Sequence, residues 1–278
     1  MLRIITDSAS DFIPGEREDI SVLPLSIIFG SEEFKDGLDL SRDDFYKRLA
    51  ASRELPKTSQ VTPYEFESEY KKVRQAGDEA LVVTLSSKLS GTYSAAVTAA
   101  AKYPEIKVVD SESVSISENL LVRLAVRLAA EGKGAEAAAG ELEAARERLN
   151  VVALFDTLEY LKKGGRLSSA ATVAGTLMGF KPLMTMKDGK VAALGKARGY
   201  NRGSGHINRL VRERGEIDFE NPPVLGYTGL DDKRLKEYLA ASEELLEGRG
   251  DELPIVRIGC TIGTHAGPGA VAVAWFSK

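Results

Sequence analysis

Cysteine and histidine are scarce in this sequence, and their scarcity excludes several kinds of site. With a single cysteine, Cys260, the chain can form no internal disulfide. The two histidines, His206 and His265, stand at no zinc-ligand spacing from each other or from Cys260, which excludes a structural zinc site. We therefore expect no bound metal and no other cofactor.

The sequence also lacks recognisable targeting and membrane segments. Residues 1–6 enter a strand pattern directly, without the charged and apolar regions of a signal peptide. The longest uncharged stretch, residues 258–277, is interrupted by glycines and by Pro268, which makes it a poor membrane span. These features predict a cytoplasmic protein without stable membrane insertion.

Excess positive charge is absent as well. The net charge is -4, whereas a nucleic-acid-binding domain normally needs a basic surface to neutralise phosphates, so we expect no nucleic-acid partner. Neither Gly-x-Gly-x-x-Gly nor a P-loop pattern follows Thr6 or Leu85, which argues against a nucleotide site. With 278 residues and 43% hydrophobic content, the chain is long and apolar enough for one large domain or two smaller ones.

The most informative stretch is residues 80–96. Residues 80–85 form a short apolar run typical of a buried strand, and an alanine-rich helical pattern follows from Thr92. The intervening loop, residues 86–91, offers serine hydroxyls and backbone N–H groups at a helix start, where an anion is stabilised. The loop is therefore a candidate anion site, although its serines could instead cap the helix with no ligand.

The first half of the chain alternates strands and helices. Strands are predicted at residues 2–6, 20–29 (bent at Pro24), 80–85 and 106–110, and helices at 43–52, 63–76, 115–130 and 135–149. This alternation predicts an α/β fold with a parallel sheet covered by helices, whose ligands bind beyond the carboxyl ends of the strands. The polar residues 7–11 and 57–60 are placed to face such a crevice, and a plain turn is the alternative for residues 7–11.

The pattern changes near Asn150. A strand at 151–155 and a capping box at 156–159 precede Asp188-Gly189, which lies between two strand patterns and is a strong hairpin signal. Further helices are predicted at 207–214 and 235–246, and strands at 224–227, 255–262 and 270–276. We expect two domains, residues 1–150 and 151–278, the second being an α/β domain with a mixed or antiparallel sheet.

Taken together, the polar motifs resemble the DegV family, bacterial fatty-acid-binding proteins that include the lipid-binding subunit of fatty acid kinase. The resemblance covers the whole chain and rests on Thr6-Asp7-Ser8 with Asp11, Lys57-Thr58-Ser59-Gln60, Ser86-Ser87-Lys88-Leu89-Ser90-Gly91-Thr92-Tyr93, Leu161-Lys162-Lys163-Gly164-Gly165-Arg166-Leu167-Ser168 and His265-Ala266-Gly267-Pro268-Gly269-Ala270. One departure is Val61, since family members often have proline at that position.

The resemblance implies a long acyl chain, of the palmitate, stearate or oleate class, buried between the two domains. It implies a carboxyl group held by Thr58, Ser90 and His265, with Ser59 and Gly91 in support. Residues 170–178 together with Phe180, Leu183, Met184 and Met186 are apolar candidates for lining the chain, or else ordinary core. Burying about 15 methylenes at roughly 0.8 kcal/mol each is enough for tight binding.

A basic segment and the resemblance together suggest a partner. Residues 157–214 contain 12 Lys and Arg against 3 acidic residues, which indicates either a solvated face or a docking face. Arg166 and Arg198 lie in this segment near the family motifs, where guanidinium groups could contact a phosphate. We expect a non-catalytic carrier that presents the fatty acid to the catalytic subunit of a separate fatty acid kinase.

A different class of function is a serine hydrolase or acyltransferase. It would use Ser90 as nucleophile and His265 as base, with Asp7 or Asp110 orienting the imidazole. The sequence lacks the Gly-x-Ser-x-Gly elbow of many such enzymes, which disfavours this alternative.

Overall fold

A computed structural model describes residues 1–52, 54–167 and 179–278 of the chain. The first half contains a four-stranded sheet in the order β2-β1-β6-β7, and every neighbouring pair is parallel, as predicted. The central strands are almost wholly buried apolar runs, which is what a sheet covered on both faces requires. The strands are β1 (Leu2–Asp7), β2 (Ile20–Leu23), β6 (Glu79–Thr84) and β7 (Ile106–Asp110).

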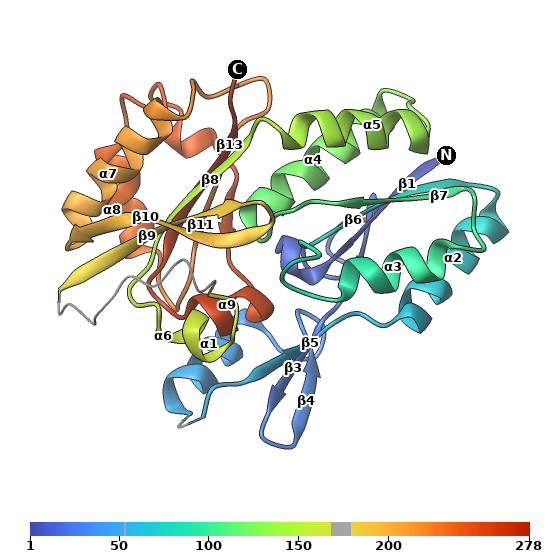
Figure 1. Cartoon of the computed structure of the whole chain (residues 1–278), viewed down its shortest axis with the longest axis horizontal. Helices are drawn as coiled ribbons and strands as arrows, with labels where there is room; N and C mark the ends of the chain where they lie inside the picture. The colour runs from blue at the N-terminus through green and yellow to red at the C-terminus, as the bar shows by residue number, and fades with distance from the viewer. Residues whose placement is uncertain (53, 168–178) are drawn as a thin grey trace.

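Helices cover both faces of this parallel sheet (Figure 1). On one face lie α2 (Pro63–Ala76) and α3 (Thr92–Ala100), and on the other lie α4 (Ile116–Ala130) and α5 (Ala135–Arg146). Helix α2 begins with the predicted capping box, in which Thr62 and Glu65 satisfy each other's backbone N–H groups, and it ends at Gly77 in the left-handed conformation.

A small antiparallel sheet, in the order β4-β3-β5, lies beside the parallel sheet. It consists of β3 (Ser26–Phe29), β4 (Glu32–Lys35) and β5 (Lys57–Ser59), with α1 (Arg42–Ala51) between β4 and β5. The prediction of one strand over residues 20–29 is therefore wrong, because the chain turns at Pro24 and enters a different sheet. Thr58, in the polar stretch 57–60, lies on strand β5 opposite Ile27, and not in a loop.

The second half contains a six-stranded mixed sheet, which confirms the prediction. Its order is β10-β9-β8-β13-β11-β12, and only β11 and β12 pair in parallel. The Asp188-Gly189 hairpin is also confirmed, since both residues have positive φ between β9 and β10. The strands are β8 (Leu149–Leu154), β9 (Phe180–Lys187), β10 (Lys190–Arg198), β11 (Val224–Tyr227), β12 (Ile255–Arg257) and β13 (Val271–Phe276).

The helices of the second half correct several predicted boundaries. Helix α7 (Tyr200–Glu213) begins earlier than expected and α8 (Lys233–Ala241) ends earlier. The predicted strand over residues 255–262 is wrong beyond Arg257, because Cys260–Ala266 forms helix α9, which carries His265. The predicted capping box at 156–159 is wrong too: helix α6 (Glu159–Lys163) has Leu158 at its N-cap, with no side-chain capping bond.

Helix α4 connects the two large sheets. One buried cluster contains Ile4 of the parallel sheet, Leu120 of α4 and Ala272 of the mixed sheet, so the apolar core is continuous across this helix. Helices α7 and α8 cover the opposite face of the mixed sheet, around Trp275 and Leu225. The proposed domain boundary at residue 150 falls where the chain has just entered β8, on one side of this shared core.

Buried carboxylates hold the loops at the carboxyl end of β1. Asp7 accepts hydrogen bonds from the backbone N–H groups of Ala9 and Leu85, at 2.9 Å each. Asp36 accepts from the N–H groups of Cys260 and Thr261, which open helix α9, and from the Thr261 hydroxyl. Asp36 therefore takes the place of the capping side chain that α9 lacks.

We expect Asp36→Ala to lower the free energy of unfolding by about 2–4 kcal/mol, because it leaves two buried N–H groups of α9 without an acceptor. The matched control is Asp251→Ala, which removes an exposed aspartate and should change stability by less than about 0.5 kcal/mol. Urea unfolding measures both. Equal stabilities of the two variants would contradict the capping role.

Candidate functional site

A cavity of about 100 Å³ lies where the small sheet, the Ser86–Gly91 loop and helix α9 meet. Three of the residues predicted to hold a carboxyl group, Thr58, Ser90 and His265, line it together, and so do Ser59 and Arg166. They reach it from separate parts of the chain: β5, the loop after β6, helix α9 and the segment after α6. The other lining residues are Leu25, Gln60, Leu85, Leu89, Val114, Phe155, Leu161, Val191, Thr261, Ile262 and Ala266.

His265 is held against Thr58. The distance from its Nε2 to the Thr58 hydroxyl is 3.0 Å, whereas its buried Nδ1 has no hydrogen-bond partner among the described residues. Burial, reinforced by the positive charge of Arg166, lowers the pKa of His265 from 6.5 to about 4, so the imidazole is neutral at pH 7. Gly164 is required here, because a Cβ at that position would lie 2.3 Å from Nδ1.

Ser90 lies near the end of the Ser86–Gly91 loop, away from β6 and next to the start of α3. Its hydroxyl is 3.0 Å from the Thr92 hydroxyl and accepts from the Thr92 N–H at 3.3 Å, so it caps the start of α3 in part. Gly91 is the N-cap residue of α3, and a Cβ there would lie 2.0 Å from Oε1 of Gln60. Gly91 therefore allows Gln60, the residue that follows β5, to approach the loop closely.

The two predicted arginines occupy different places. Arg166 lines the cavity and donates to the backbone carbonyls of Gly164 (2.8 Å) and Leu89 (3.3 Å), with no carboxylate partner among the described residues. Arg198 is exposed at the end of β10 and does not line this cavity. The structure brings only Arg166 to the hydroxyls and the imidazole.

A second cavity, of about 80 Å³, adjoins the first and is lined almost entirely by apolar side chains. The two share Val114, Phe155, Val191, Ile262 and Ala266 in their walls. From there the second cavity extends between the start of α4 and the mixed sheet, where Val151, Ala153, Ile258 and Ala272 line it. The two cavities thus share a wall. We call the first the polar cavity, because it holds the hydroxyls, the imidazole and the guanidinium among its apolar lining residues, and the second the apolar cavity.

The predicted chain-lining residues divide between the faces of β9. Met184 and Met186 line the second cavity, whereas Leu183 packs in the cluster on the opposite face of the sheet and is therefore ordinary core, the stated alternative. Side chains alternate along a strand, which explains the split. Phe180 lines neither cavity, and residues 170–178 lie outside the described residues.

The arrangement does not support the hydrolase alternative. The imidazole faces Thr58, and Ser90 is bonded to Thr92. The carboxylates proposed to orient His265 are used elsewhere: Asp7 accepts from Leu85 and Ala9, and Asp110 accepts from the N–H groups of Ser87 and Glu112. A relay from carboxylate to imidazole to serine is therefore not present in the described part of the chain.

No cluster of three potential metal ligands occurs within residues 1–52, 54–167 and 179–278. In the same ranges, no helix combines the length and hydrophobicity needed to cross a membrane.

The fold and the site define an α/β binding protein in which hydroxyls, an imidazole and a guanidinium open onto an apolar cavity. The family model described as "Uncharacterised protein, DegV family" matches residues 1–278, and the chain belongs to this family. A DegV domain-containing protein of Caldanaerobacter subterraneus is 34% identical, with 100% of this chain and 99% of that protein covered.

Solved structures of the family share the whole fold. A DegV family protein from Thermus thermophilus, described by its fatty acid binding, has a TM-score of 0.87 at 29% identity. A stearic acid-binding protein from Eubacterium ventriosum has a TM-score of 0.87 at 27% identity. DegV of Bacillus subtilis, described as a fatty acid binding protein, has a TM-score of 0.82 at 28% identity. Each match covers 100% of this chain and 99% of the other.

Several residues of the site are not indicated by the sequence. Gln60 lies in one of the family motifs without a predicted role, and Ile262 lies on α9 and not in the predicted strand. The first turn of α4, with Ser115 and Ile116, was not connected to the site at all. The apolar pattern of α4 gives no indication that its first turn faces a cavity, because packed and cavity-lining residues share the same periodicity.

The depressed pKa of His265 predicts a pH-dependent stability. The unfolded chain protonates this histidine near pH 6.5 and the folded chain near pH 4, so its contribution to stability is complete above pH 6.5 and is lost as the pH falls toward 4. The loss amounts to about 3 kcal/mol.

The measurement compares urea unfolding of the parent and His265→Gln from pH 7.5 to 4. The difference in stability between the parent and His265→Gln isolates the contribution of His265. Asp7 and Asp11 are present in both proteins, and because burial raises their pKa values, their contribution to stability falls as the pH rises, opposite to that of His265. A difference that does not change with pH would contradict a buried neutral imidazole.

Proposed function

We propose that this protein binds one long-chain fatty acid, with the carboxylate in the first cavity and the acyl chain in the second. The observation that carries the proposal is that the two cavities share five lining residues, with Thr58 and His265 in the first cavity and Met184 and Met186 in the second. A carboxylate attached to a long apolar chain has the same distribution of polar and apolar groups.

The first cavity offers the donors that a buried carboxylate needs. The Thr58 and Ser90 hydroxyls can donate, and the Arg166 guanidinium supplies a positive charge without a carboxylate partner of its own among the described residues. His265 stands beside these donors, with its Nε2 3.0 Å from the Thr58 hydroxyl. Removing a carboxylate from water is costly unless such partners are present.

The second cavity supplies affinity and tolerance. Its walls combine aliphatic side chains with Met184 and Met186, whose flexible thioethers adapt to chains of different shape. Each buried methylene contributes roughly 0.8 kcal/mol before ordering costs. The descriptions of the three solved relatives, which name fatty acid or stearic acid binding, support the same class of ligand for this chain.

We expect the protein purified from a bacterial host to carry about one fatty acid per chain, and Thr58→Ala, Ser90→Ala or His265→Ala to weaken binding by about 1–3 kcal/mol each. Each change leaves a buried carboxylate oxygen short of a donor. Organic extraction with mass spectrometry measures the bound fatty acid, and titration with a fluorescent fatty acid measures the affinity.

The matched control is Thr98→Ala, which removes an exposed hydroxyl of α3 away from both cavities and should bind as the parent does. If the parent contains no acyl chain and takes none up from added lipid, the function is wrong. If it binds, but all three variants bind equally well at unchanged stability, the carboxylate site has been misplaced.

We further propose that the protein is a carrier for a separate fatty acid kinase. Ser90, Arg166 and His265 line the first cavity and are each only partly buried, so the carboxylate end of the ligand would lie near the surface. The exposed Lys88 and Lys162 are close in sequence to lining residues and favour an anionic product such as an acyl phosphate. Arg198 belongs to the same basic segment and is assigned to the kinase encounter.

We expect acyl-phosphate formation from bound oleate or palmitate, ATP and magnesium only when the cognate kinase is added, because the sequence contains no nucleotide-binding loop. The double variant Arg166→Ala, Arg198→Ala should turn over more slowly than the parent at equal ligand loading. Phosphorylation by this chain alone would refute the carrier role, and full turnover by the double variant would refute the role of the arginines.

A further inference from the structure

The β9–β10 hairpin extends beyond the strand that should support it. Strand β8 pairs with β9 only at Ala153–Met184 and Leu154–Leu183, so residues 186–190 have no paired neighbour in β8, whereas Val191 is held by a parallel bridge to Leu167. Figure 1 shows the hairpin reaching from the mixed sheet toward the parallel sheet. We call residues 186–191 the distal hairpin.

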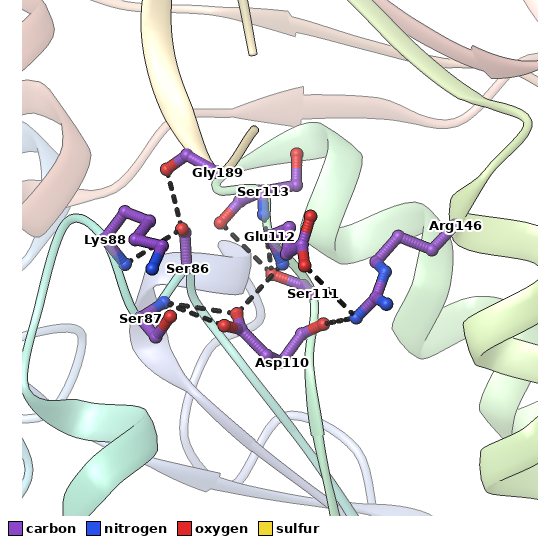
Figure 2. Close-up of polar contacts among 9 residues, drawn as sticks. All are labelled: Ser86, Ser87, Lys88, Asp110, Ser111, Glu112, Ser113, Arg146 and Gly189. Carbon is purple, nitrogen blue, oxygen red and sulfur yellow. Dashed lines mark hydrogen bonds and ion pairs between the residues drawn. The ribbon is translucent and has the colours of Figure 1, made fainter. Parts of the chain in front are cut away.

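The tip of the distal hairpin is attached to the Ser86–Gly91 loop. The Ser86 hydroxyl donates to the carbonyl oxygen of Gly189 at 2.7 Å, as Figure 2 shows. Gly189 is buried although Asp188 and Lys190 on either side of it are exposed, which shows how closely the tip is seated. A Cβ on Gly189 would lie 2.7 Å from the Ser86 hydroxyl and 2.9 Å from Cγ of Lys88.

The loop that receives the tip is itself firmly held. The Ser86 N–H donates to the Ser113 carbonyl at 2.8 Å, and the Ser87 N–H donates to the Asp110 carboxylate at 3.1 Å (Figure 2). Arg146 donates to the Asp110 carbonyl at 2.7 Å. Ser90 N–H donates back to the Ser86 carbonyl, so the same short loop carries both the hairpin contact and the Ser90 hydroxyl.

The distal hairpin forms part of the wall of both cavities. Met186 lines the apolar cavity, and Val191 lines the apolar and the polar cavity. The Ser86–Gly189 contact therefore joins the wall around the acyl chain to the loop beside the carboxylate. A chain entering or leaving the apolar cavity needs a wall to move, and residues 186–190 of the distal hairpin have no β8 neighbour, while the Leu167–Val191 bridge holds the base.

We propose that Ser86 and Gly189 are positioning residues that hold the distal hairpin closed over the acyl chain, and that breaking their contact is the step that lets the fatty acid exchange. This inference rests on the proposed fatty acid binding. Because the contact closes the wall in the free and in the occupied protein alike, it affects both rates in the same direction and leaves the equilibrium affinity nearly unchanged.

The test measures association and dissociation of a fluorescent fatty acid by stopped flow for the parent, Ser86→Ala and Gly189→Ala. Each variant should raise both rates by about two- to tenfold, the factor expected for one lost hydrogen bond, with a smaller change in Kd. Since both variants break the same contact, the double variant should exchange little faster than the faster single variant.

Two control variants separate the contact from local side effects. Ser87→Ala removes the neighbouring hydroxyl, which takes no part in the contact with Gly189. Gly30→Ala introduces a Cβ at another hairpin glycine with positive φ, where no atom lies within 4 Å. Both controls should exchange fatty acid at the rate of the parent. Acceleration by the controls equal to that of Ser86→Ala would overturn the proposal.

Amide deuterium exchange of residues 182–194 in the ligand-free proteins provides a readout independent of fatty acid. It should be faster in Ser86→Ala and Gly189→Ala than in the parent. Unchanged deuterium exchange in the hairpin, or a weaker Kd with an unchanged association rate, would overturn the inference while leaving fatty acid binding intact. A parent that binds no fatty acid would overturn the proposed function and the exchange role with it.

Discussion

The structure depends on buried carboxylates at the carboxyl end of β1, which hold loops from distant parts of the chain. Asp7 binds the N–H of Leu85, at the start of the Ser86–Gly91 loop, and Asp11 and Asp36 bind the amides of Gly259, Cys260 and Thr261, where α9 begins. Burial raises the pKa of Asp7 to about 7 and that of Asp11 to about 6, so these acceptors are costly to keep charged. The cost is offset because each carboxylate satisfies backbone N–H groups that would otherwise be buried without partners.

This anchoring explains how a site can be assembled from segments with little regular structure of their own. Helix α9 has no side-chain cap, and β5 is only 3 residues long. Even so, the Thr58 hydroxyl on β5 lies 3.0 Å from Nε2 of His265 on α9. The position of α9 is set by Asp36, and that of β5 by its pairing with β3. The geometry of the polar cavity is therefore determined by buried backbone contacts, and exposed surface side chains contribute little to it.

Local patterns predicted the parts of the fold that local interactions determine. The capping box of Thr62 and Glu65 and the Asp188-Gly189 hairpin follow from residues close together in the sequence. The parallel sheet was predicted from the alternation of strand and helix patterns, although it pairs residues as distant as Leu2 and Glu79. The failures are non-local. Residues 20–29 form strands of two sheets, and residues 258–262 leave a strand for a helix whose amides find their acceptors at Asp11 and Asp36, more than two hundred positions away. The family motifs identified Thr58, Ser90 and His265, but periodicity could not separate Met184, which lines a cavity, from Leu183, which does not.

The polar cavity carries an electrostatic imbalance that an anion would correct. Arg166 is positive and has no carboxylate partner within the described residues, and its charge and the burial of the site together keep His265 neutral. A bound carboxylate would oppose the effect of the Arg166 charge on the imidazole, since a nearby negative charge favours the protonated form. The head group would thus gain a charge-assisted partner in Arg166 and bring His265 closer to protonation. A neutral apolar ligand would fill the second cavity equally well but leave this imbalance in place, and so under the proposed function the first cavity would favour the acid among molecules with the same chain.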